Sequence, residues 1–264
     1  MSSPGRRAVP AVAGAGRLPE LAADWVFFLD IDGTLLEHAE RPDAVRPGEP
    51  LFRLLAELHQ ATGGALALIS GRSVSDIDVL FSPLKLPAAG QHGIERRDAR
   101  GAVHRHAFPA DALRGAAARI GEFAARHPGL LFEDKGHNLA LHYRLAPQLA
   151  GAAQAALREV AEQLGDDFEV LNGKMVVELK PSGRDKGSAI EEFMREPPFA
   201  GRTPVFVGDD QTDEYGFGVV NRLGGQSVKV GPESSAARWR IADAFAVRVW
   251  LHEWVARFGA GRTA

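Results

Sequence analysis

The 264-residue sequence contains no cysteine, no long apolar run and no excess of basic residues. Without cysteine there are no disulfides, zinc–thiolate sites, iron–sulfur clusters or thiol nucleophiles. A membrane helix needs about 20 consecutive apolar residues, and no run approaches that length. The 31 basic and 34 acidic residues leave a net charge of −3, which is not the charge of a nucleic-acid-binding protein. We expect a cytoplasmic protein with neither nucleic acid nor membrane as a partner.

Lysine is also scarce, since it supplies only six of the 31 basic residues. A lysine ammonium is a compact point charge, whereas the arginine guanidinium is a planar fork, so the two side chains suit different sites. Four of the six lysines lie between residues 135 and 186. We interpret them as positions that require an ammonium group. For Lys135 and Lys174 the alternative is that hairpin turns favour polar residues.

Both ends of the sequence show the pattern of a parallel α/β sheet. Solid apolar runs predict strands that are buried on both faces. Leucines at helical spacing between two such runs predict an amphipathic helix, and strand–helix–strand order implies a right-handed crossover. The predicted strands cover 25–29, 65–69, 204–207 and 227–230, and the predicted helices cover 48–62, 186–194 and 249–258.

The middle of the sequence has a different rhythm, which predicts the order αββαββ. Helices are expected over 111–127 and 147–164, each followed by a hairpin. The first hairpin is expected to turn at Lys135-Gly136 and the second at Asn172-Gly173. The second is the stronger signal, because an Asn-Gly pair between apolar runs favours a tight turn. We interpret 109–181 as an inserted domain, 24–108 with 182–264 as its parent, and 1–23 as a flexible tail.

Polar residues follow three of the predicted core strands, in segments 30–34 (DIDGT), 70–72 (SGR) and 208–213 (GDDQTD). Ligands of open α/β sheets bind beyond the carboxyl ends of the strands, so these segments are expected to converge. Carboxylates packed this densely repel one another unless a cation lies among them. An all-oxygen set indicates a hard cation, Mg²⁺ above all. A helix cap or a solvated acidic loop is the alternative for each segment taken alone.

The same residues suit phosphoryl transfer. A carboxylate can act as the nucleophile, and the N–H groups of Gly33 and Thr34 are placed where a phosphate could bind. Such catalysis depends mainly on positioning and on neutralising charge. The sequence therefore predicts an enzyme that handles phosphate esters.

DIDGTL, a serine at a later strand end, a lysine and GDDQTDE together resemble the haloacid dehalogenase (HAD) superfamily of aspartyl phosphatases. The full GDDQTDE motif, the Ser70-Gly71-Arg72 triplet and the αββαββ insertion resemble the trehalose-6-phosphate phosphatase family within it. The resemblance covers roughly residues 24–258. It implies an α/β fold with a HAD-like Rossmannoid core, a parallel sheet and an inserted α/β cap that selects the substrate.

The resemblance also implies a role for each matching residue. Asp30 would be the nucleophile and Asp32 the general acid and base, while Ser70 and Lys186 would hold the phosphate. Mg²⁺ would be bound by the Asp30 carboxylate, the Asp32 carbonyl and Asp209, with Asp213 acting through water. The substrate-binding residues would be Gly33, Thr34, Arg72, Gln91, His92, Gly93, Lys135, His142, Arg144, Lys174, Glu178 and Lys180.

The resemblance implies Mg²⁺-dependent hydrolysis of trehalose 6-phosphate, so the expected partner is a small-molecule sugar phosphate. We expect the chain to be a monomer. Three alternatives stay open at this point. The chain could act on sucrose phosphate or a hexose phosphate, pass the phosphoryl group to a sugar as a phosphomutase, or sense a sugar phosphate without catalysis. One local feature disagrees with the pattern: Gly216 and Gly218 lie in the helix expected after GDDQTDE (208–214), where each costs roughly 1 kcal/mol relative to alanine.

Overall fold

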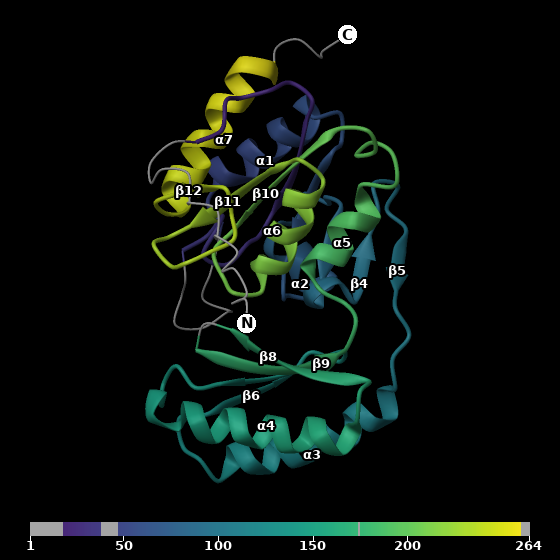
Figure 1. Ribbon diagram of the computed structural model, residues 1–264, viewed down its shortest axis with the longest axis vertical. Coiled ribbons are helices and arrows are strands. Elements are labelled where there is room, and N and C mark those ends of the chain that lie inside the picture. Colours follow the sequence, from purple (N-terminus) through teal and green to yellow (C-terminus); the bar gives the residue numbers. More distant parts are fainter. Residues whose placement is uncertain (1–17, 38–46, 174, 260–264) are drawn as a thin grey trace, which may run out of the picture.

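The computed structural model describes residues 18–37, 47–173 and 175–259. These residues form a larger and a smaller α/β unit that lie one above the other along the long axis of the molecule (Figure 1). The larger sheet has eight strands in the order β12-β11-β10-β1-β2-β3-β4-β5, and the smaller has four in the order β6-β7-β9-β8. No helix among the described residues is both long and apolar enough to cross a membrane.

The larger sheet is mostly parallel, as predicted. Its strands are β1 (Trp25–Leu29), β2 (Leu66–Ile69), β3 (Ala88–Gly90), β4 (Glu95–Arg97), β5 (Val103–Arg105), β10 (Thr203–Gly208), β11 (Gln226–Val230) and β12 (Trp239–Ile241). The antiparallel pairs are β3–β4 and β4–β5, and all other neighbours are parallel. The sequence did not predict β3, β4, β5 or β12, because each has only three residues and no long apolar run.

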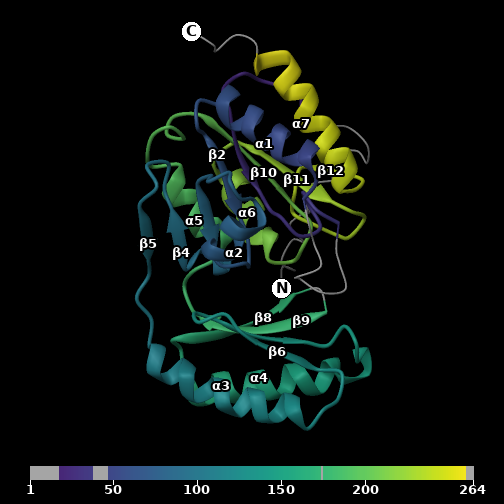
Figure 2. The ribbon, with the colours of Figure 1, turned by 180° about the vertical axis from the view of Figure 1, so that it is seen from behind.

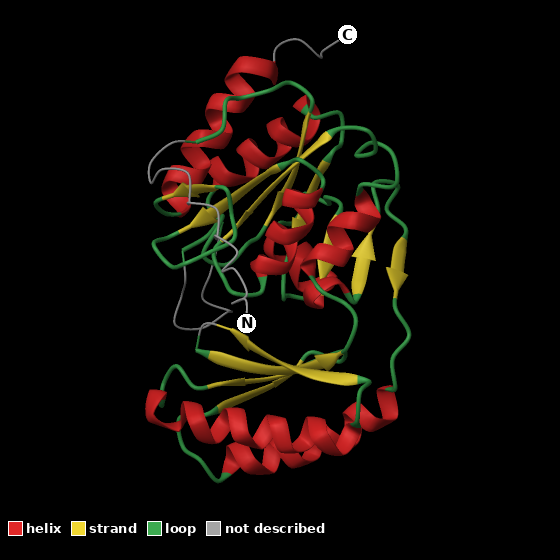
Figure 3. Ribbon diagram, in the orientation of Figure 1, coloured by secondary structure: helices red, strands yellow, loops and turns green. Residues whose placement is uncertain are grey.

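Helices cover both faces of the larger sheet (Figures 1 and 3). On one face lie α1 (Glu49–Ala61), α2 (Val74–Leu80) and α7 (Ala244–Phe258), and on the other lie α5 (Lys186–Phe193) and α6 (Asp213–Arg222). The prediction for α7 began at 249, but the helix starts at Ala244, because the Asp243 side chain caps it by accepting a hydrogen bond from Ala246 N.

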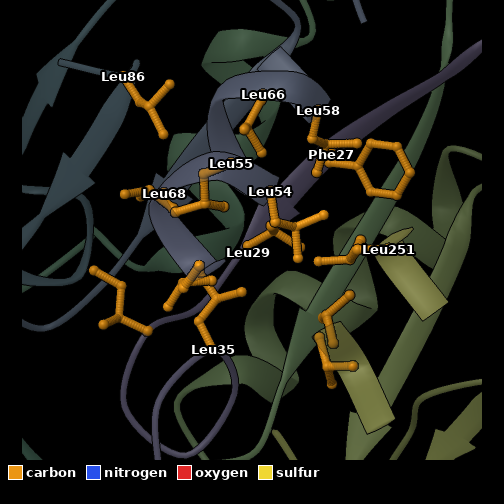
Figure 4. Packing of buried hydrophobic residues seen from close by; sticks show 14 of the residues in the cluster. Phe27, Leu29, Leu35, Leu54, Leu55, Leu58, Leu66, Leu68, Leu86 and Leu251 are labelled. Carbon is orange, nitrogen blue, oxygen red and sulfur yellow. The ribbon is translucent and has the colours of Figure 1, made fainter. Parts of the chain in front are cut away.

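Alternate residues of the central strands supply the two cores. Phe27 and Leu29 of β1 point toward α1, where they meet Leu54, Leu55 and Leu58 (Figure 4). The intervening residues of β1 pack against α5 and α6 on the opposite face. Full burial of each large apolar side chain contributes about 1.5–3 kcal/mol. This packing buries β1 on both faces and so fixes the position of its carboxyl end.

The smaller unit has the predicted αββαββ order. It consists of α3 (Ala110–Ala125), β6 (Leu131–Asp134), β7 (Leu139–His142), the 3₁₀ turn η3 (Pro147–Leu149), α4 (Ala150–Leu164), β8 (Phe168–Gly173) and β9 (Val176–Pro181). Its two helices cover the sheet face that is turned away from the larger unit (Figure 2). Val177 and Leu179 of β9 pack with those helices, so Glu178 and Lys180 point the other way, toward the larger unit.

The turn predicted at Asn172-Gly173 was wrong. Both residues belong to β8, where Asn172 pairs with Val177 and Gly173 with Val176. Continued ladder pairing keeps both residues in the strand. Met175 has a φ of 65°, in the left-handed region that tight turns use. Lys174 lies outside the described residues.

Of the segment 1–23, residues 1–17 lie outside the described residues, but the remainder is packed: Leu18 and Leu21 contact the core, and Trp254 Nε1 donates to Ala22 O at 2.9 Å.

The glycines of α6 do not prevent the helix. A Cβ at Gly216 would lie 2.3 Å from the Phe206 ring, so this glycine lets α6 approach the sheet closely.

Candidate active site

The carboxyl ends of three adjacent parallel strands place the predicted residues at one edge of the larger sheet. Asp30 follows β1, Ser70 follows β2 and Asp209 follows β10, and the strand order there is β10-β1-β2. Asp30 and Ser70 are both buried. The structure therefore brings the three polar segments together, as parallel pairing requires.

Three carboxylates meet at this edge. Asp30, Asp209 and Asp213 each offer an oxygen, and these oxygens all lie within 4.8 Å of one another. Asp30 and Asp213 are almost completely buried. Lys186, the first residue of α5, lies between them: its Nζ donates to Asp30 Oδ1 at 2.7 Å and to Asp213 Oδ1 at 2.6 Å. An ammonium thus partly neutralises the cluster.

Burial dominates the titration of these groups. It raises the pKa of Asp30 well above the ordinary value, and Asp213 and Asp209 raise it further, while Lys186 opposes them. Burial also raises the pKa of Asp213. For Lys186 burial alone would lower the pKa, but Asp213 and Asp30 outweigh it and the pKa is raised. Lys186 therefore stays charged, and the cluster favours a further cation.

The loop between β10 and α6 is held by Asp213. Its Oδ2 accepts hydrogen bonds from Asp209 N at 2.9 Å and from Asp210 N at 2.8 Å. A Cβ at Gly208 would lie 2.3 Å from Asp213 Cγ, so the glycine creates the space for this contact. Both Asp213 oxygens thus already carry hydrogen bonds within the protein.

Asp32 forms a two-pronged ion pair with Arg72. Arg72 Nε donates to Asp32 Oδ2 and Arg72 Nη2 to Asp32 Oδ1, both at 2.7 Å. Burial would lower the pKa of Arg72, but Asp32 outweighs it and the pKa is raised. Ser70 Oγ accepts a hydrogen bond from Arg72 N at 3.1 Å. Arg72 therefore contacts Asp32 directly, which the sequence did not predict.

Gly33 and Thr34 form the turn that follows Asp32. Gly33 has a φ of 90°, which favours glycine, and its N–H donates to Leu36 O at 2.7 Å, so that group closes the turn. Thr34 is fully buried, and its Oγ1 has no hydrogen-bond partner among the described residues. A buried hydroxyl of this kind is suited to a ligand oxygen.

Glu178 of β9 is the centre of a second cluster, where the smaller unit meets the larger one. Its Oε1 accepts from Lys135 Nζ at 2.6 Å and from Asn138 Nδ2 at 3.1 Å, and its Oε2 lies 2.6 Å from His92 Nε2. Burial would raise the pKa of Glu178, but Lys135 and His92 outweigh it, and the pKa lies far below the ordinary value. Asn138 was missed, since a lone asparagine after a turn carries no distinctive signal.

The 3₁₀ turn η2 (Gln91–Gly93) supplies the other side of this contact. Gln91 Nε2 donates to Lys135 O at 2.8 Å. Gln91 and His92 have φ values of 47° and 55°, an unusual backbone conformation for non-glycine residues, and Gly93 has a φ of 94°. A Cβ at Gly93 would lie 2.5 Å from Asp185 O, which leaves no space for a side chain. This turn brings Gln91 and His92 into contact with Lys135 and Glu178 of the smaller unit.

The remaining predicted residues are less central. His142 Nε2 lies 2.9 Å from Glu133 Oε2 on the neighbouring strand, and Arg144 is half-buried beyond the end of β7. The Lys180 ammonium pairs with Glu169 and donates to the carbonyls of Pro181 and Arg184, so it holds the chain segment that returns to the larger unit. Lys174 lies outside the described residues.

The parallel core with its inserted αββαββ unit is the fold of solved HAD phosphatases. One solved structure of that superfamily, from Bacteroides thetaiotaomicron, matches with a TM-score of 0.61 at 15% identity over 93% of this chain and 99% of its own. The C-terminal domain of a C. albicans trehalose-6-phosphate phosphatase matches with a TM-score of 0.81 at 22% identity, over 89% and 92% of the two chains. At these identities the likeness concerns the fold.

Sequence comparison gives the family. The trehalose-phosphatase family model matches residues 28–249. A trehalose-6-phosphate phosphatase of Escherichia coli (strain K12) is 46% identical over 233 residues, which are 88% of this chain and 87% of the relative. The chain belongs to the trehalose-phosphatase family.

Proposed function

We propose that this protein hydrolyses trehalose 6-phosphate to trehalose and phosphate in trehalose biosynthesis. The observation that carries the proposal is the pairing of two clusters across the boundary between the units. The Asp30–Lys186–Asp213 cluster of the larger unit suits phosphoryl transfer, and the Glu178–Lys135–His92 cluster suits a sugar. The family and the 46% identity to the E. coli enzyme support this substrate.

The cofactor is Mg²⁺ in this proposal. The donor set consists of carboxylate oxygens from Asp30, Asp209 and Asp213, which is what a hard cation prefers. Asp30 and Asp209 would hold the ion directly, with the Asp32 carbonyl. Asp213 would hold it through water, since both of its oxygens accept hydrogen bonds from the protein. The bound ion would neutralise charge on the phosphoryl group.

In the first step a carboxylate oxygen of Asp30 attacks phosphorus. An O–P bond forms to Asp30 while the bond from phosphorus to the sugar oxygen breaks, and Asp32 donates its proton to that oxygen. Lys186, 2.7 Å from Asp30 Oδ1, orients the nucleophile and neutralises phosphate charge. Ser70 and Thr34 are the hydroxyl donors at the same edge.

In the second step water attacks the aspartyl-phosphate. Asp32 takes the proton from the water, the O–P bond to Asp30 breaks, and phosphate leaves with the Asp30 carboxylate restored. Asp32 can exchange protons only when its two-pronged pair with Arg72 opens. A substrate phosphate is a suitable replacement partner for the Arg72 guanidinium, so binding of substrate would release Asp32.

The smaller unit acts as the cap that selects the sugar. Glu178, Lys135, His92 and Gln91 supply charged and neutral donors and acceptors that suit the many hydroxyls of a disaccharide. His142, Arg144, Lys174 and Lys180 extend this set in the proposal, although Lys180 acts by holding the segment that joins the units. With the cap in contact with the core, bulk water is excluded from the phosphoryl group.

The test is a phosphate-release screen over sugar phosphates with and without Mg²⁺. We expect trehalose 6-phosphate to be hydrolysed with a higher kcat/KM than sucrose or hexose phosphates, and only with the metal present. Equal rates on all substrates would remove the substrate assignment and leave the chemistry. Binding without phosphate release would indicate a sensor, and transfer of the phosphoryl group to an added sugar would indicate a phosphomutase.

A further inference from the structure

Lys229 is a buried lysine with no part in the mechanism above. It lies near the end of β11, beside the carboxyl end of β10, and its side chain is only 3% exposed. Its Nζ donates to the carbonyl oxygens of Asp209 and Val230, the latter at 2.7 Å, and lies 3.3 Å from Glu233 Oε2. An ammonium has three N–H donors, and these three acceptors satisfy all of them.

The contact of Lys229 with Asp209 O is one of two hydrogen bonds that hold the backbone of Asp209. Asp209 lies in the loop between β10 and α6, outside regular structure. Its N–H is held by Asp213 Oδ2 at 2.9 Å, and its carbonyl is held by Lys229. The two peptide groups that flank the Asp209 Cα are therefore each anchored by a buried charged side chain. Fixed flanking peptides restrict the direction in which the Asp209 carboxylate leaves the backbone.

We propose that Lys229 is a positioning residue for the metal ligand Asp209. The inference rests on the proposed function, which makes Asp209 a ligand of Mg²⁺. Lys229 keeps the carboxylate aimed at the oxygens of Asp30 and Asp213 before the ion arrives, so less ordering is required on binding. Partners that orient a metal ligand typically account for a 10- to 100-fold difference in metal affinity.

Lysine suits this position better than arginine. The three acceptors surround one nitrogen atom, whereas the donors of a guanidinium are spread over a planar fork. The sequence has 31 basic residues and only six lysines, so the preference for arginine elsewhere makes the lysine here informative. A buried ammonium is costly without acceptors, and here every donor has one.

The chain offers a control in Arg97, a buried cation outside the candidate site. Its guanidinium makes three hydrogen bonds, two to Leu86 O and one to Asp78 Oδ2. It lies on β4, four strands from β10 in the order of the larger sheet. Arg97→Met and Lys229→Met therefore each remove a buried cation with three hydrogen bonds, and only the second removes a contact to Asp209.

The experiment is calorimetric titration of Mg²⁺ into the full-length wild type, Lys229→Met, Lys229→Arg and Arg97→Met, with thermal unfolding recorded for each. We expect the Mg²⁺ dissociation constant to rise about 10-fold or more in Lys229→Met. Lys229→Arg keeps the charge and part of the hydrogen bonding, so its Mg²⁺ dissociation constant should lie between those of the wild type and Lys229→Met. Arg97→Met should lose thermal stability but bind Mg²⁺ within twofold of the wild type.

A Lys229→Met dissociation constant within twofold of the wild type would overturn the inference. Equal weakening of Mg²⁺ binding in Arg97→Met would do the same, since it would indicate a general loss of stability. If Lys229→Met does not fold, Lys229→Arg is the test. A rise of more than twofold in its Mg²⁺ dissociation constant supports the positioning role, and a smaller rise contradicts it. A wild type that binds no Mg²⁺ would contradict the proposed cofactor itself, which is a different result from an unchanged variant.

Discussion

Lys186 Nζ lies 2.7 Å from Asp30 Oδ1, in a contact where both side chains are almost fully buried. The two residues are 156 positions apart in the sequence, at the N-terminus of α5 and the end of β1. Desolvation of two charges is repaid only when the pair is well formed and further hydrogen bonds satisfy it. Asp213 supplies the second acceptor for Lys186, which makes this pair the centre of the site.

Replacing Asp30 with Asn should abolish turnover, because an amide cannot form the aspartyl-phosphate. We expect kcat to fall by at least about 10³-fold. The variant should still fold, since the amide fits the same space and its oxygen can still accept from Lys186. Steady-state phosphate release, with circular dichroism as the folding control, measures both. Activity near the wild-type level would remove Asp30 as the nucleophile.

Replacing Arg72 should affect catalysis more than stability. The pair with Asp32 is partly exposed, so Arg72→Ala should change the unfolding free energy by about 1 kcal/mol or less. The kcat/KM for trehalose 6-phosphate should fall about 10²-fold, because both the phosphate contact and the placement of Asp32 are lost. Arg72→Lys should not restore it, since one ammonium cannot bond both oxygens of Asp32 at once. Full activity in Arg72→Lys would show that charge alone suffices.

Gly208→Ala tests the space beside Asp213. The added Cβ would lie 2.3 Å from Asp213 Cγ, so the carboxylate and the loop that it holds must shift. We expect a loss of about 1–3 kcal/mol in stability and weaker Mg²⁺ binding. Gly218→Ala in α6 is the matched control, because the nearest atom to its Cβ is Arg222 Nη1 at 3.8 Å. That change should stabilise by up to about 1 kcal/mol. Denaturant unfolding measures the stability change in both variants. Equal changes in the two would refute the steric argument.

Glu178→Gln should separate sugar recognition from phosphoryl transfer. The carboxylate contacts Lys135 and His92 but none of the residues at the β1 end. We expect kcat/KM for trehalose 6-phosphate to fall about 10²-fold, and hydrolysis of a small aryl phosphate to change less than about threefold. Arg144→Ala should discriminate in the same direction. Equal losses on both substrates would remove the case for selection by the cap.

The same residue predicts a pH dependence of stability. Burial opposes ionisation of Glu178, but Lys135 and His92 hold its pKa far below the value of about 4.3 in an unfolded chain. A depressed pKa stabilises the folded state above the unfolded pKa, and the contribution is lost as the pH falls toward the folded pKa. The Tm difference between wild type and Glu178→Gln should therefore be largest near pH 7 and shrink below about pH 4. A difference that does not vary with pH would contradict this.

Much of the fold follows from local pattern. Solid apolar runs identified β1, β2, β10 and β11, and leucine spacing identified α1, because burial on two faces or on one helical stripe leaves a direct mark on composition. Three-residue strands such as β3 and β12 leave no such mark. The prediction of a turn at Asn172-Gly173 failed because ladder pairing between β8 and β9 overrides the local preference of these two residues.

The same distinction between local pattern and tertiary contact holds for the candidate site. Asp30, Asp32, Ser70 and Asp209 could be selected from the sequence, since parallel strands carry the residues after their carboxyl ends to one edge. The contacts of Asn138 with Glu178, and of Lys229 with Asp209, join residues whose spacing along the chain says nothing about their distance. Scarcity of lysine was the one signal that could have indicated Lys229.

The sequence by itself determined the kinds of chemistry open to this protein. Lacking cysteine, it has no thiolate ligand or thiol nucleophile, and the acids at its strand ends offer oxygen ligands and a carboxylate nucleophile. Only the tertiary structure decided which charges meet: Lys186 with Asp30 and Asp213, Arg72 with Asp32, Glu178 with Lys135 and His92. Strand-end composition is a local property, whereas a buried ion pair forms only where the packing of distant elements excludes water and aligns both partners.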